Sequence, residues 1–513
     1  MQRRAFLQTA LAGLLGGALA STTRASMTRA EGAPTAFSFE TVIDRARAAA
    51  AQPFQRPTMA LTDPFAGLGY DAFRAIRPRA DKRLFGEAQG FQVDLLPPGG
   101  QYADRVEIAL VTGGMATPVA FSADFFDFQP EFFPFPDGRA PAGAGAGLGF
   151  SGFRVRHELN RPGVWDETLV FQGASYFRAV ARDTLYGLSA RGLALGTGGP
   201  AEEFPLFTAF WIEEPARGAD TLTLYAQLDS ASVTGAYAFR VTPGVETAME
   251  IEARLFPRAD LNAVGVAPLT SMYYFGPESR VGIDDFRDAV HDSGGLRMIN
   301  GLGERLLRPL RNPRKLEVSA FLDQTPQSFG LIQRFRDFAH YQDAEARYEL
   351  RPSAWVEPQG DWGRGAVILI EIPTGDEFAD NIVAFWRPEA PLLAGSEHAF
   401  AYRLVWGQTP GEALPLAEII ATRSGKSIHD GDERSFAVDF DLGRMDAAGL
   451  TPRIETTAGE AHGLSLVRLP GEGNLGRAAF SLAPGGAETV EFRLGLYAGD
   501  RQVSELWLYR WSA

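Results

Sequence analysis

A short loop with three carboxylates is the part of this sequence whose residue types best suit chemistry. The loop holds Asp376, Glu377 and Asp380, and it lies between two short apolar runs at residues 366–370 and 382–386. Both runs are rich in β-branched residues and bounded by Gly or Pro, so we expect two strands. Carboxylates held between two core strands suit acid–base chemistry on an uncharged polar substrate such as a sugar. The alternative is a solvated hairpin tip, because acidic residues favour turns.

The composition limits the class of protein. The chain has 513 residues, of which 45% are hydrophobic and 22% charged, and this is enough for a large core and two domains. The formal charge is 49 − 63 = −14, and no basic patch suited to nucleic acid is visible, so we expect no nucleic-acid partner. The absence of cysteine excludes disulfides, thiol catalysis and cysteine-ligated metals. The 56 Gly and 33 Pro residues indicate many turns and a β-rich architecture.

The N-terminus has the features of an export signal. Two adjacent arginines at residues 3–4 are followed by a hydrophobic pair, and residues 10–20 form a mild apolar run. This pattern predicts a twin-arginine signal peptide at residues 1–25, cleaved after Ala20 or Ala25, and hence a periplasmic protein exported already folded. An uncleaved membrane anchor is the alternative, but the run is too short and too rich in glycine to span a bilayer well. No later segment has 18 consecutive apolar residues, so we expect the mature protein to be soluble.

The pattern along the chain predicts few helices and many strands. Ser38 can cap a helix that runs to residue 51, and residues 70–76 indicate a second short helical turn. From there to about residue 386 the pattern is mostly that of strands, as at residues 221–228 and 247–255. Antiparallel strands in succession favour sandwich layers over a parallel sheet with crossover helices. Residues 331–340 fit a short helix or a strand, and their pattern does not decide between the two.

A segment with two prolines and a glycine, residues 387–396, is the best candidate for a linker. It predicts a first β-sandwich domain at residues 33–390 and a second domain at residues 396–513. The second part contains short strands with clean alternation, such as residues 436–442 and 490–496. Short alternating strands over this length fit an immunoglobulin-like sandwich.

Several other motifs fail the tests of spacing. The glycines between residues 143 and 149 are not followed by Lys-Ser/Thr, so a loop is a better interpretation than a phosphate-binding site. Residues 187–192 lack the spacing of a nucleophile elbow. None of the six histidines is paired at metal-ligand spacing, so we expect neither a metal nor another cofactor. A Ser-His-Asp set stays open, although nothing local supports it.

Aromatic residues beside charged residues and glycine are candidates for sugar contacts. Sugars are bound by flat aromatic faces and by polar groups that reach their hydroxyls. Most of the 37 phenylalanines must be buried in the core, so Trp and Tyr next to Arg, Asp or Gly are better candidates. The candidates for substrate binding are Arg154, Tyr273, Tyr348, Arg351, Trp355 and Trp362.

Ordered motifs between residues 148 and 386 resemble the periplasmic glucan biosynthesis protein family, members G and D (MdoG type). The matching stretches include GFSGFR, FQGASYFR, YGLSARGLA, GVAPLTSM, HDSGGL, RYELRPSAWVEP and EIP..DE..DNIVAFW. The twin-arginine signal makes the D members the closer match, because G members are exported unfolded by the general route.

The resemblance implies a large galactose-mutarotase-like β-sandwich followed by an immunoglobulin-like β-sandwich. It implies action in the periplasm on osmoregulated glucans with a β-1,2-linked glucose backbone. The expected function is an anomer-inverting β-1,2-glucanase, a glycoside hydrolase. The alternatives are an anomer-inverting transglycosylase that makes cyclic glucans, and a non-catalytic glucan-binding accessory of the glucan synthase. Implied partners are β-1,2-glucan, a second copy of the chain and a membrane glucan synthase.

The resemblance also assigns roles to residues. The Asp of the DNIV motif, Asp380, matches the general acid, and the Asp of the HDS motif, Asp292, matches a base that acts through a proton relay. Glu377 and Tyr348 match further polar positions of the cleft. A general acid must carry a proton, and neighbouring carboxylates disfavour its ionised form by like-charge repulsion.

Several positions depart from the family pattern, including residues 304–307, where the family usually carries two tryptophans and this chain has Glu-Arg-Leu-Leu. The acidic loop commonly reads DETNDNIV, but this chain has Phe378 and Ala379 at the two central positions. The HDS motif usually carries Asn or Asp where this chain has Gly294. These differences leave open the product length and the balance between hydrolysis and transfer.

Overall fold

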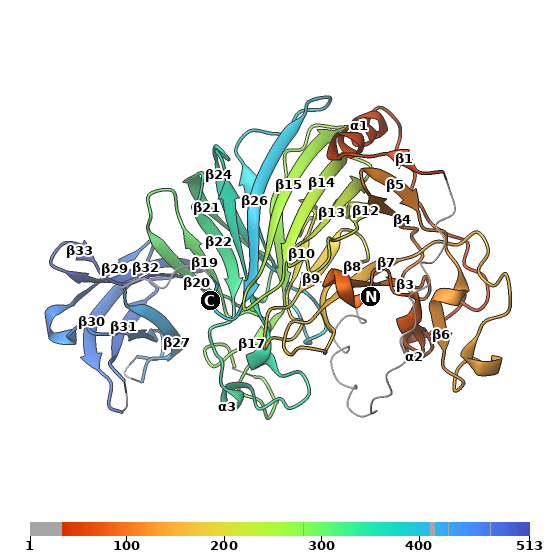
Figure 1. The fold of residues 1–513 in the computed structure, drawn as a ribbon. Coiled ribbons are helices and arrows are strands. Elements are labelled where there is room, and N and C mark those ends of the chain that lie inside the picture. Colours follow the sequence, from red (N-terminus) through yellow and green to blue (C-terminus); the bar gives the residue numbers. More distant parts are fainter. Residues whose placement is uncertain (1–32, 281, 411–415, 429, 472) are drawn as a thin grey trace. The chain divides into compact units, whose positions relative to one another are not determined.

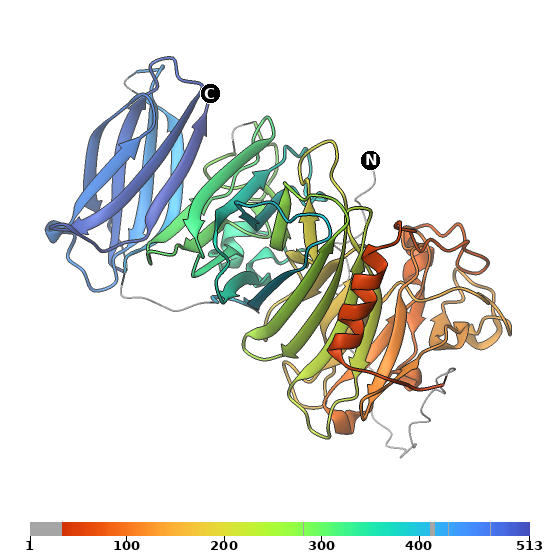
Figure 2. The same cartoon turned by 90° about the horizontal axis from the view of Figure 1, so that it is seen from above.

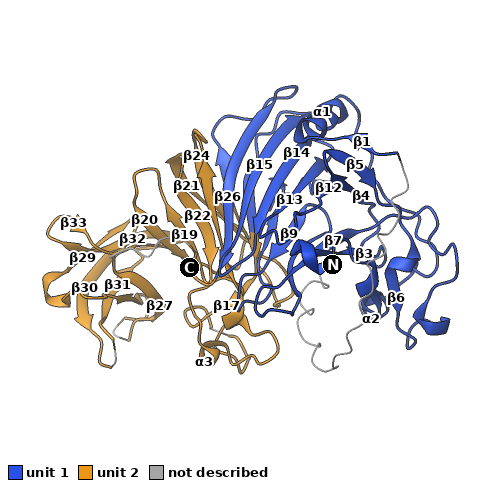
Figure 3. Ribbon diagram, viewed as in Figure 1, with its two compact units in different colours: residues 1–269, 385–407 blue, residues 270–384, 408–513 orange. Residues whose placement is uncertain are grey.

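The computed structural model describes residues 33–513 apart from residues 281, 411–415, 429 and 472. The predicted signal peptide at residues 1–25 lies outside the described residues. The chain divides into two compact units, unit 1 with residues 1–269 and 385–407 and unit 2 with residues 270–384 and 408–513 (Figure 3). Within the described part, no helix is long and apolar enough to cross a membrane.

Unit 1 contains one layer of long, mostly antiparallel strands (Figure 1). β13, β14 and β15 form successive antiparallel pairs, and β15 also pairs with β26, while β4 lies parallel to β12. The strands of this layer, in spatial order, are β1 (Thr35–Ala36), β5 (Met115–Pro118), β4 (Glu107–Thr112), β12 (Leu206–Glu213), β13 (Leu222–Asp229), β14 (Val233–Thr242), β15 (Thr247–Pro257) and β26 (His398–Gly407).

A second layer of unit 1 is built from shorter strands. Its strands are β16 (Val264–Ser271), β10 (Ser189–Arg191), β9 (Tyr176–Ala179), β8 (Asp166–Gln172), β7 (Gly152–His157) and β3 (Gln92–Leu96), with β11 (Leu193–Leu195) paired to β16. A separate two-stranded ribbon consists of β2 (Ile76–Pro78) and β6 (Phe126–Phe128), and the short helix α2 (Tyr70–Arg74) precedes it.

Phenylalanine rings join the two layers of unit 1. Phe171 of β8 packs against Phe239 of β14 with ring centroids 5.3 Å apart, and Phe153 of β7 packs against Phe210 of β12 at 4.9 Å. All four rings are at most 2% exposed. Both contacts are edge-on, and aromatic rings of this kind supply much of the buried apolar area of a sandwich core.

Helix α1 (Phe39–Ala50) covers the outer face of the long-strand layer (Figure 2). Ser38 precedes it as the N-cap, as the sequence predicted, and the Ser38 N–H donates to Thr41 Oγ1 at 3.2 Å. The buried face of the helix carries Val42, Ile43 and Ala46, which belong to one hydrophobic cluster with residues of β12 and β14. Thr234 Oγ1 donates to Ala46 O at 2.7 Å and attaches the helix to β14.

Unit 2 is also built mainly from strands. One path runs β23 (Ser353–Gln359), β22 (Ser328–Ile332), β19 (Gly295–Ile299), β20 (Arg305–Pro309), β34 (Leu506–Ser512), β32 (Thr489–Ala498) and β29 (Thr451–Thr456), with β33 (Arg501–Gln502) paired to β32. A second path runs β21 (Glu317–Gln324), β24 (Arg364–Glu371) and β25 (Ile382–Pro388). β17 (Tyr273–Phe275) and β18 (Val290–His291) form a two-stranded sheet. A four-stranded sheet has the order β27 (Glu418–Lys426), β28 (Arg434–Asp441), β31 (Leu475–Ala483) and β30 (Glu460–Arg468). The helix α3 (Phe338–Tyr341) is a single turn.

The C-terminal part of unit 2 is a two-layer sandwich. Phe436 of β28 and Phe480 of β31 pack against Phe492 of β32, with ring centroids 5.2 and 5.5 Å from it. Trp507 of β34 is fully buried in the same cluster, and its indole N–H donates to Thr422 Oγ1 at 2.9 Å. This agrees with the alternating strands predicted for this region.

The mainly β prediction is confirmed, and the sheets are consistent with β-sandwich domains. The undecided residues 331–340 contain the end of β22, an irregular stretch and α3. The strand β26, which follows the predicted linker, pairs with β15 and belongs to unit 1. The boundaries of two domains at residues 33–390 and 396–513 stay a prediction.

Candidate active site

The acidic loop connects β24 to β25, and two asparagines of unit 2 fasten it. Asn381 donates from Nδ2 to Tyr273 O (2.9 Å) and Ile372 O (3.0 Å), and its Oδ1 accepts from the Tyr273 N–H (2.8 Å). Asn312 donates to Thr374 O (2.9 Å) and accepts from the Thr374 N–H (2.9 Å). The loop backbone is therefore held at both ends by buried or half-buried amide groups.

Replacing Asn381 with alanine removes three hydrogen bonds from a side chain that is 2% exposed. The backbone groups of Tyr273 and Ile372 then lose their partner, and a buried polar group left without one costs about 1–3 kcal/mol. We expect Asn381→Ala to lower the free energy of unfolding by about that amount, measured by urea denaturation. An unchanged denaturation midpoint would contradict the anchoring role.

Glu377 of the acidic loop contacts two side chains from other segments. Its Oε2 accepts hydrogen bonds from the Tyr348 hydroxyl (2.8 Å) and from Arg287 Nη1 (2.8 Å). Its side chain is 23% exposed, so the carboxylate also reaches solvent. Burial raises the pKa of Tyr348 well above its usual range, so this hydroxyl keeps its proton and acts as the donor.

Arg287 joins three segments of unit 2 through carboxylates. It forms a bidentate pair with Asp285 (3.0 and 2.8 Å) and single contacts with Asp343 (2.7 Å) and Glu377 (2.8 Å). Hydrogen bonding to Asp285, supported by Asp343 and Glu377, raises the pKa of Arg287. Burial alone would raise the pKa of Asp343, but the Ala346 N–H and Arg287 bring it below its usual value. The guanidinium therefore holds the Glu377 side chain in a fixed orientation.

Asp292, the predicted base, forms a buried ion pair with Arg351. Arg351 Nη1 lies 2.6 Å from Asp292 Oδ1, and the two residues are 3% and 1% exposed. The Arg351 guanidinium carbon also lies 4.5 Å from the centroid of the Tyr348 ring. The contacts thus run without a break from Asp292 through Arg351 and Tyr348 to Glu377, and four residues predicted from the sequence lie together.

The predicted acid Asp380 lies in the same loop and is half-buried. It directly precedes Asn381, so its backbone is fixed by the anchor described above. Asp376 is exposed, and its Oδ1 accepts from the Phe378 N–H at 2.9 Å, which is the contact of a turn-forming carboxylate. The three carboxylates therefore differ in surroundings: one forms the turn, one is held by Arg287 and one is half-buried beside the anchor.

Histidine and tyrosine rings pack behind this set of contacts. His291 is 1% exposed and stacks on Tyr273 with centroids 5.2 Å apart. It also lies edge-on to Tyr341 at 5.2 Å. Burial lowers the pKa of His291 to about 3, and the neighbouring His340 adds to this effect. The ring is therefore neutral at physiological pH and serves as packing next to Asp292.

Because the pKa of His291 is about 3 in the folded state and 6.5 in the unfolded chain, protons favour unfolding below pH 6.5. The contribution of His291 to the free energy of unfolding is unchanged above pH 7 and is lower by about 2 kcal/mol at pH 5. We expect His291→Phe to remove this loss, measured as the difference between urea midpoints at pH 7.5 and pH 5. Equal pH dependence in the variant and the parent protein would contradict a buried neutral histidine.

Comparison with known proteins agrees with the motifs that surround this site. The sequence model of the family described as "Periplasmic glucan biosynthesis protein, MdoG" matches residues 37–511. The chain belongs to this family. Proteins named "Glucans biosynthesis protein G" are similar to it. The protein from Vibrio cholerae serotype O1 is 45% identical over 486 residues, which cover 93% of this chain and 87% of the relative. The protein from Rhodopseudomonas palustris is 45% identical over 484 residues (93% and 94%), and that from Bradyrhizobium diazoefficiens is 43% identical over 509 residues (97% and 99%).

Membership of the MdoG family confirms the resemblance seen in the motifs. It places the protein in the periplasm and gives it a role in periplasmic glucan biosynthesis. The closer likeness to D members was predicted from residues 1–25, which lie outside the described residues, and it stays a prediction together with the twin-arginine route.

The predicted aromatic contacts of this family member lie in the interior. Trp355 and Tyr273 are each 1% exposed, and Trp362 is 6% exposed. A Cβ at Gly330 would meet the Trp355 ring at 2.6 Å, which shows how closely β22 and β23 pack there. The three rings are buried, and their assignment as sugar contacts stays a prediction.

Arg154, the remaining candidate for substrate binding, belongs to unit 1. It contacts Asp94 (2.8 Å) and Glu167 (2.8 Å), and Arg83 and Arg156 also contact Asp94. Burial would raise the pKa of Asp94, but the three guanidinium groups lower it. Arg154 is therefore part of an ion network that compensates a buried carboxylate.

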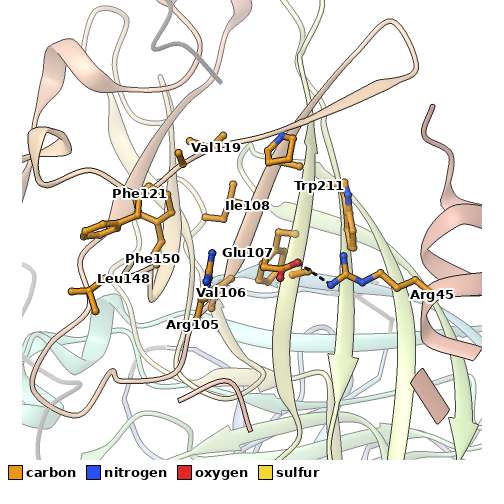
Figure 4. A pocket seen from close by; sticks show the side chains of 16 residues that line it. Arg45, Arg105, Val106, Glu107, Ile108, Val119, Phe121, Leu148, Phe150 and Trp211 are labelled. Atoms are coloured by element: carbon orange, nitrogen blue, oxygen red, sulfur yellow. Dashed lines mark hydrogen bonds and ion pairs between the residues drawn. The ribbon is translucent and has the colours of Figure 1, made fainter. Parts of the chain in front are cut away.

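Unit 1 also contains a cavity of about 380 Å³ (Figure 4). Arg45 pairs with Glu107 at 2.8 Å on one side of it, and the Arg45 guanidinium lies 5.3 Å from the centroid of the Trp211 ring. None of the residues predicted as site residues lines this cavity. Among the described residues, no group of three or more His, Asp or Glu side chains is placed to hold a metal ion.

Proposed function

We propose that this protein is an anomer-inverting glycoside hydrolase that cleaves the β-1,2-linked backbone of periplasmic glucans. Asp380 gives its proton to the oxygen of the leaving sugar, and a water molecule attacks the anomeric carbon from the opposite face. The proton released by that water passes to Asp292 through a relay. One bond breaks between the anomeric carbon and the bridging oxygen, and one forms between that carbon and the water oxygen.

The observation that carries this proposal is the continuous set of contacts from Asp292 through Arg351 and Tyr348 to Glu377. It supports a shared role for the HDS motif and the acidic loop in one site. Asp292 is 1% exposed, so a proton from an attacking water has to reach it through another group. The ion pair with Arg351 supplies the positive charge that an ionised carboxylate needs in a buried position.

Tyr348 and Glu377 support the relay by their geometry. The Tyr348 hydroxyl donates to Glu377 at 2.8 Å and its ring lies against Arg351, so the hydroxyl stands between the partly exposed loop and the buried pair. Glu377 is fixed by Arg287 and is 23% exposed, which suits a group that orients substrate or water at the mouth of the site.

The test is one incubation of the mature protein with linear β-1,2-glucan, scored by chromatography for product size, cyclisation and anomer. Hydrolysis with inversion gives shorter linear chains whose new reducing ends start in the α configuration. Cyclic or lengthened products with few new reducing ends would instead identify a transglycosylase. Saturable binding without any product would identify an accessory of glucan synthesis and overturn the proposal.

A further inference from the structure

Phe286 and Phe378 of unit 2 are exposed, and each lies beside charged residues. Phe286 is 79% exposed and belongs to the run Asp-Asp-Phe-Arg-Asp at residues 284–288. Phe378 is 44% exposed and belongs to the acidic loop, between Glu377 and Ala379. Covering an exposed apolar ring with a ligand is favourable, so exposed rings in and next to the candidate site are candidates for ligand contacts.

The segment that carries Phe286 is fixed by two arginines. Arg280 donates to the carbonyl oxygens of Asp285 and Arg287 and pairs with Asp288 at 2.7 Å. The Arg287 N–H donates to Asp285 Oδ1 at 2.9 Å, and the Arg287 guanidinium forms the bidentate pair with the same carboxylate. The backbone on both sides of Phe286 is therefore hydrogen-bonded, and the ring stands on an ordered support.

The segment that carries Phe378 is fixed in a similar way. The Phe378 N–H donates to Asp376 Oδ1 at 2.9 Å, and Thr374 Oγ1 donates to Asp376 O at 2.9 Å. The asparagine anchors hold the two ends of the loop. Because both segments are already ordered, binding at these rings does not carry the free-energy cost of ordering a loop.

A direct contact joins the two segments. Arg287, the neighbour of Phe286, donates to Glu377, the neighbour of Phe378, at 2.8 Å. The Arg287 guanidinium carbon also lies 5.9 Å from the centroid of the Phe286 ring. Each ring is therefore the chain neighbour of one member of the Arg287–Glu377 pair, and Phe378 lies two residues before Asp380 in the acidic loop.

We propose that Phe286 and Phe378 form an aromatic platform that binds glucose units of a neutral glucan chain beside the Arg287–Glu377 pair. The apolar C–H faces of glucose fit flat rings, and Arg287 and Glu377 offer a donor and an acceptor for hydroxyls. The carboxylates around the rings disfavour an anionic ligand. The identity of the chain as β-1,2-glucan rests on the proposed function, whereas the platform itself rests on the exposed rings and their ordered supports.

The platform is tested with Phe286→Ala and Phe378→Ala, each placed in the Asp380→Asn background so that binding is measured without turnover. The probe is linear β-1,2-glucan, and the dissociation constant is measured by titration calorimetry. We expect each substitution to raise it roughly five- to tenfold, as the loss of one ring contact implies. In the catalytically intact protein, the same substitutions should raise KM with kcat little changed.

The matched control is Phe132→Ala, because Phe132 is 41% exposed and lies in unit 1. It should leave the dissociation constant unchanged, and Phe378→Trp should preserve binding because it keeps a flat ring. Unchanged binding in both Phe286→Ala and Phe378→Ala, with normal turnover by the parent protein, would overturn the platform and leave the proposed function intact. If the variants lose binding but the parent protein shows no turnover, the hydrolase proposal is wrong and the platform proposal stands. A parent protein that does not bind the probe overturns both.

Discussion

Replacement of Asp380 with asparagine is expected to lower the rate of β-1,2-glucan cleavage about 10³-fold. Asparagine is close to aspartate in size but has no proton to give to the leaving oxygen, so bond cleavage loses its acid catalyst. The side chain is half-buried at the edge of a loop that Asn381 holds, so the fold should tolerate the change. The measurement is the initial rate of new reducing ends from linear β-1,2-glucan, with circular dichroism to show that the variant is folded.

Asp376→Asn is the matched control for this experiment. Asp376 lies in the same loop, is exposed, and uses Oδ1 to accept the Phe378 N–H, a bond that the amide oxygen of asparagine can also accept. Removal of this charge should therefore change the rate little. A folded Asp380→Asn variant with normal activity would show that another group protonates the leaving sugar. Equal losses in the two variants would indicate that the total charge of the loop matters rather than one acid.

The elements around the acidic loop could be predicted from the sequence because their patterns are local. The apolar runs at residues 366–370 and 382–386 are β24 and β25, since short β-branched segments between Gly and Pro have few other ways to fold. The helix after Ser38 and the alternating strands β28 and β32 follow from local signals in the same way. Local patterns do not specify the partner of a strand, however. The pairing of β26 with β15, which joins strands on the two sides of the predicted linker, could therefore not be predicted.

The contacts of the site were harder to predict because they join distant segments. Glu377 meets Arg287 and Tyr348 across separations of 90 and 29 residues, and no spacing in the sequence indicates these pairs. Arg287, Asn312 and Asn381 were not among the predicted residues. A usable signal was present for Arg287, because an arginine among three aspartates at residues 284–288 has partners close by.

The choice of aromatic residues shows a further limit of sequence reasoning. Trp and Tyr were favoured over Phe as sugar contacts, yet Trp355 and Tyr273 are each 1% exposed, while Phe286 and Phe378 are 79% and 44% exposed. The polar groups of Trp and Tyr allow them to be buried with hydrogen bonds, as for the Tyr348 hydroxyl on Glu377. Phe286 and Phe378 have charged neighbours, but so do the buried Phe125 and Phe126, so the sequence does not distinguish exposed from buried phenylalanines in this chain.

Replacement of Arg351 with methionine is expected to lower the free energy of unfolding by about 3–5 kcal/mol. The substitution removes an ion-pair partner of Asp292, a carboxylate that is 1% exposed, and weaker pairing of a buried charge is costly. It also removes the hydrogen bonds from Arg351 to Ala346 O and the guanidinium that lies on the Tyr348 ring. The measurement is urea denaturation followed by tryptophan fluorescence, with midpoints compared at equal slope.

A second substitution separates the charge effect from the loss of packing. In Arg351→Met/Asp292→Asn the buried carboxylate is neutral, so the double variant should be more stable than Arg351→Met alone, although Asp292→Asn destabilises the parent protein. Arg351→Lys keeps the positive charge without the planar fork and should cost less than methionine. Additive effects of the two single substitutions would contradict a coupled buried pair. If coupling is found and Arg351→Met also lacks cleavage at temperatures where it is folded, the pair contributes to catalysis by holding Asp292 in place, in addition to stabilising the fold.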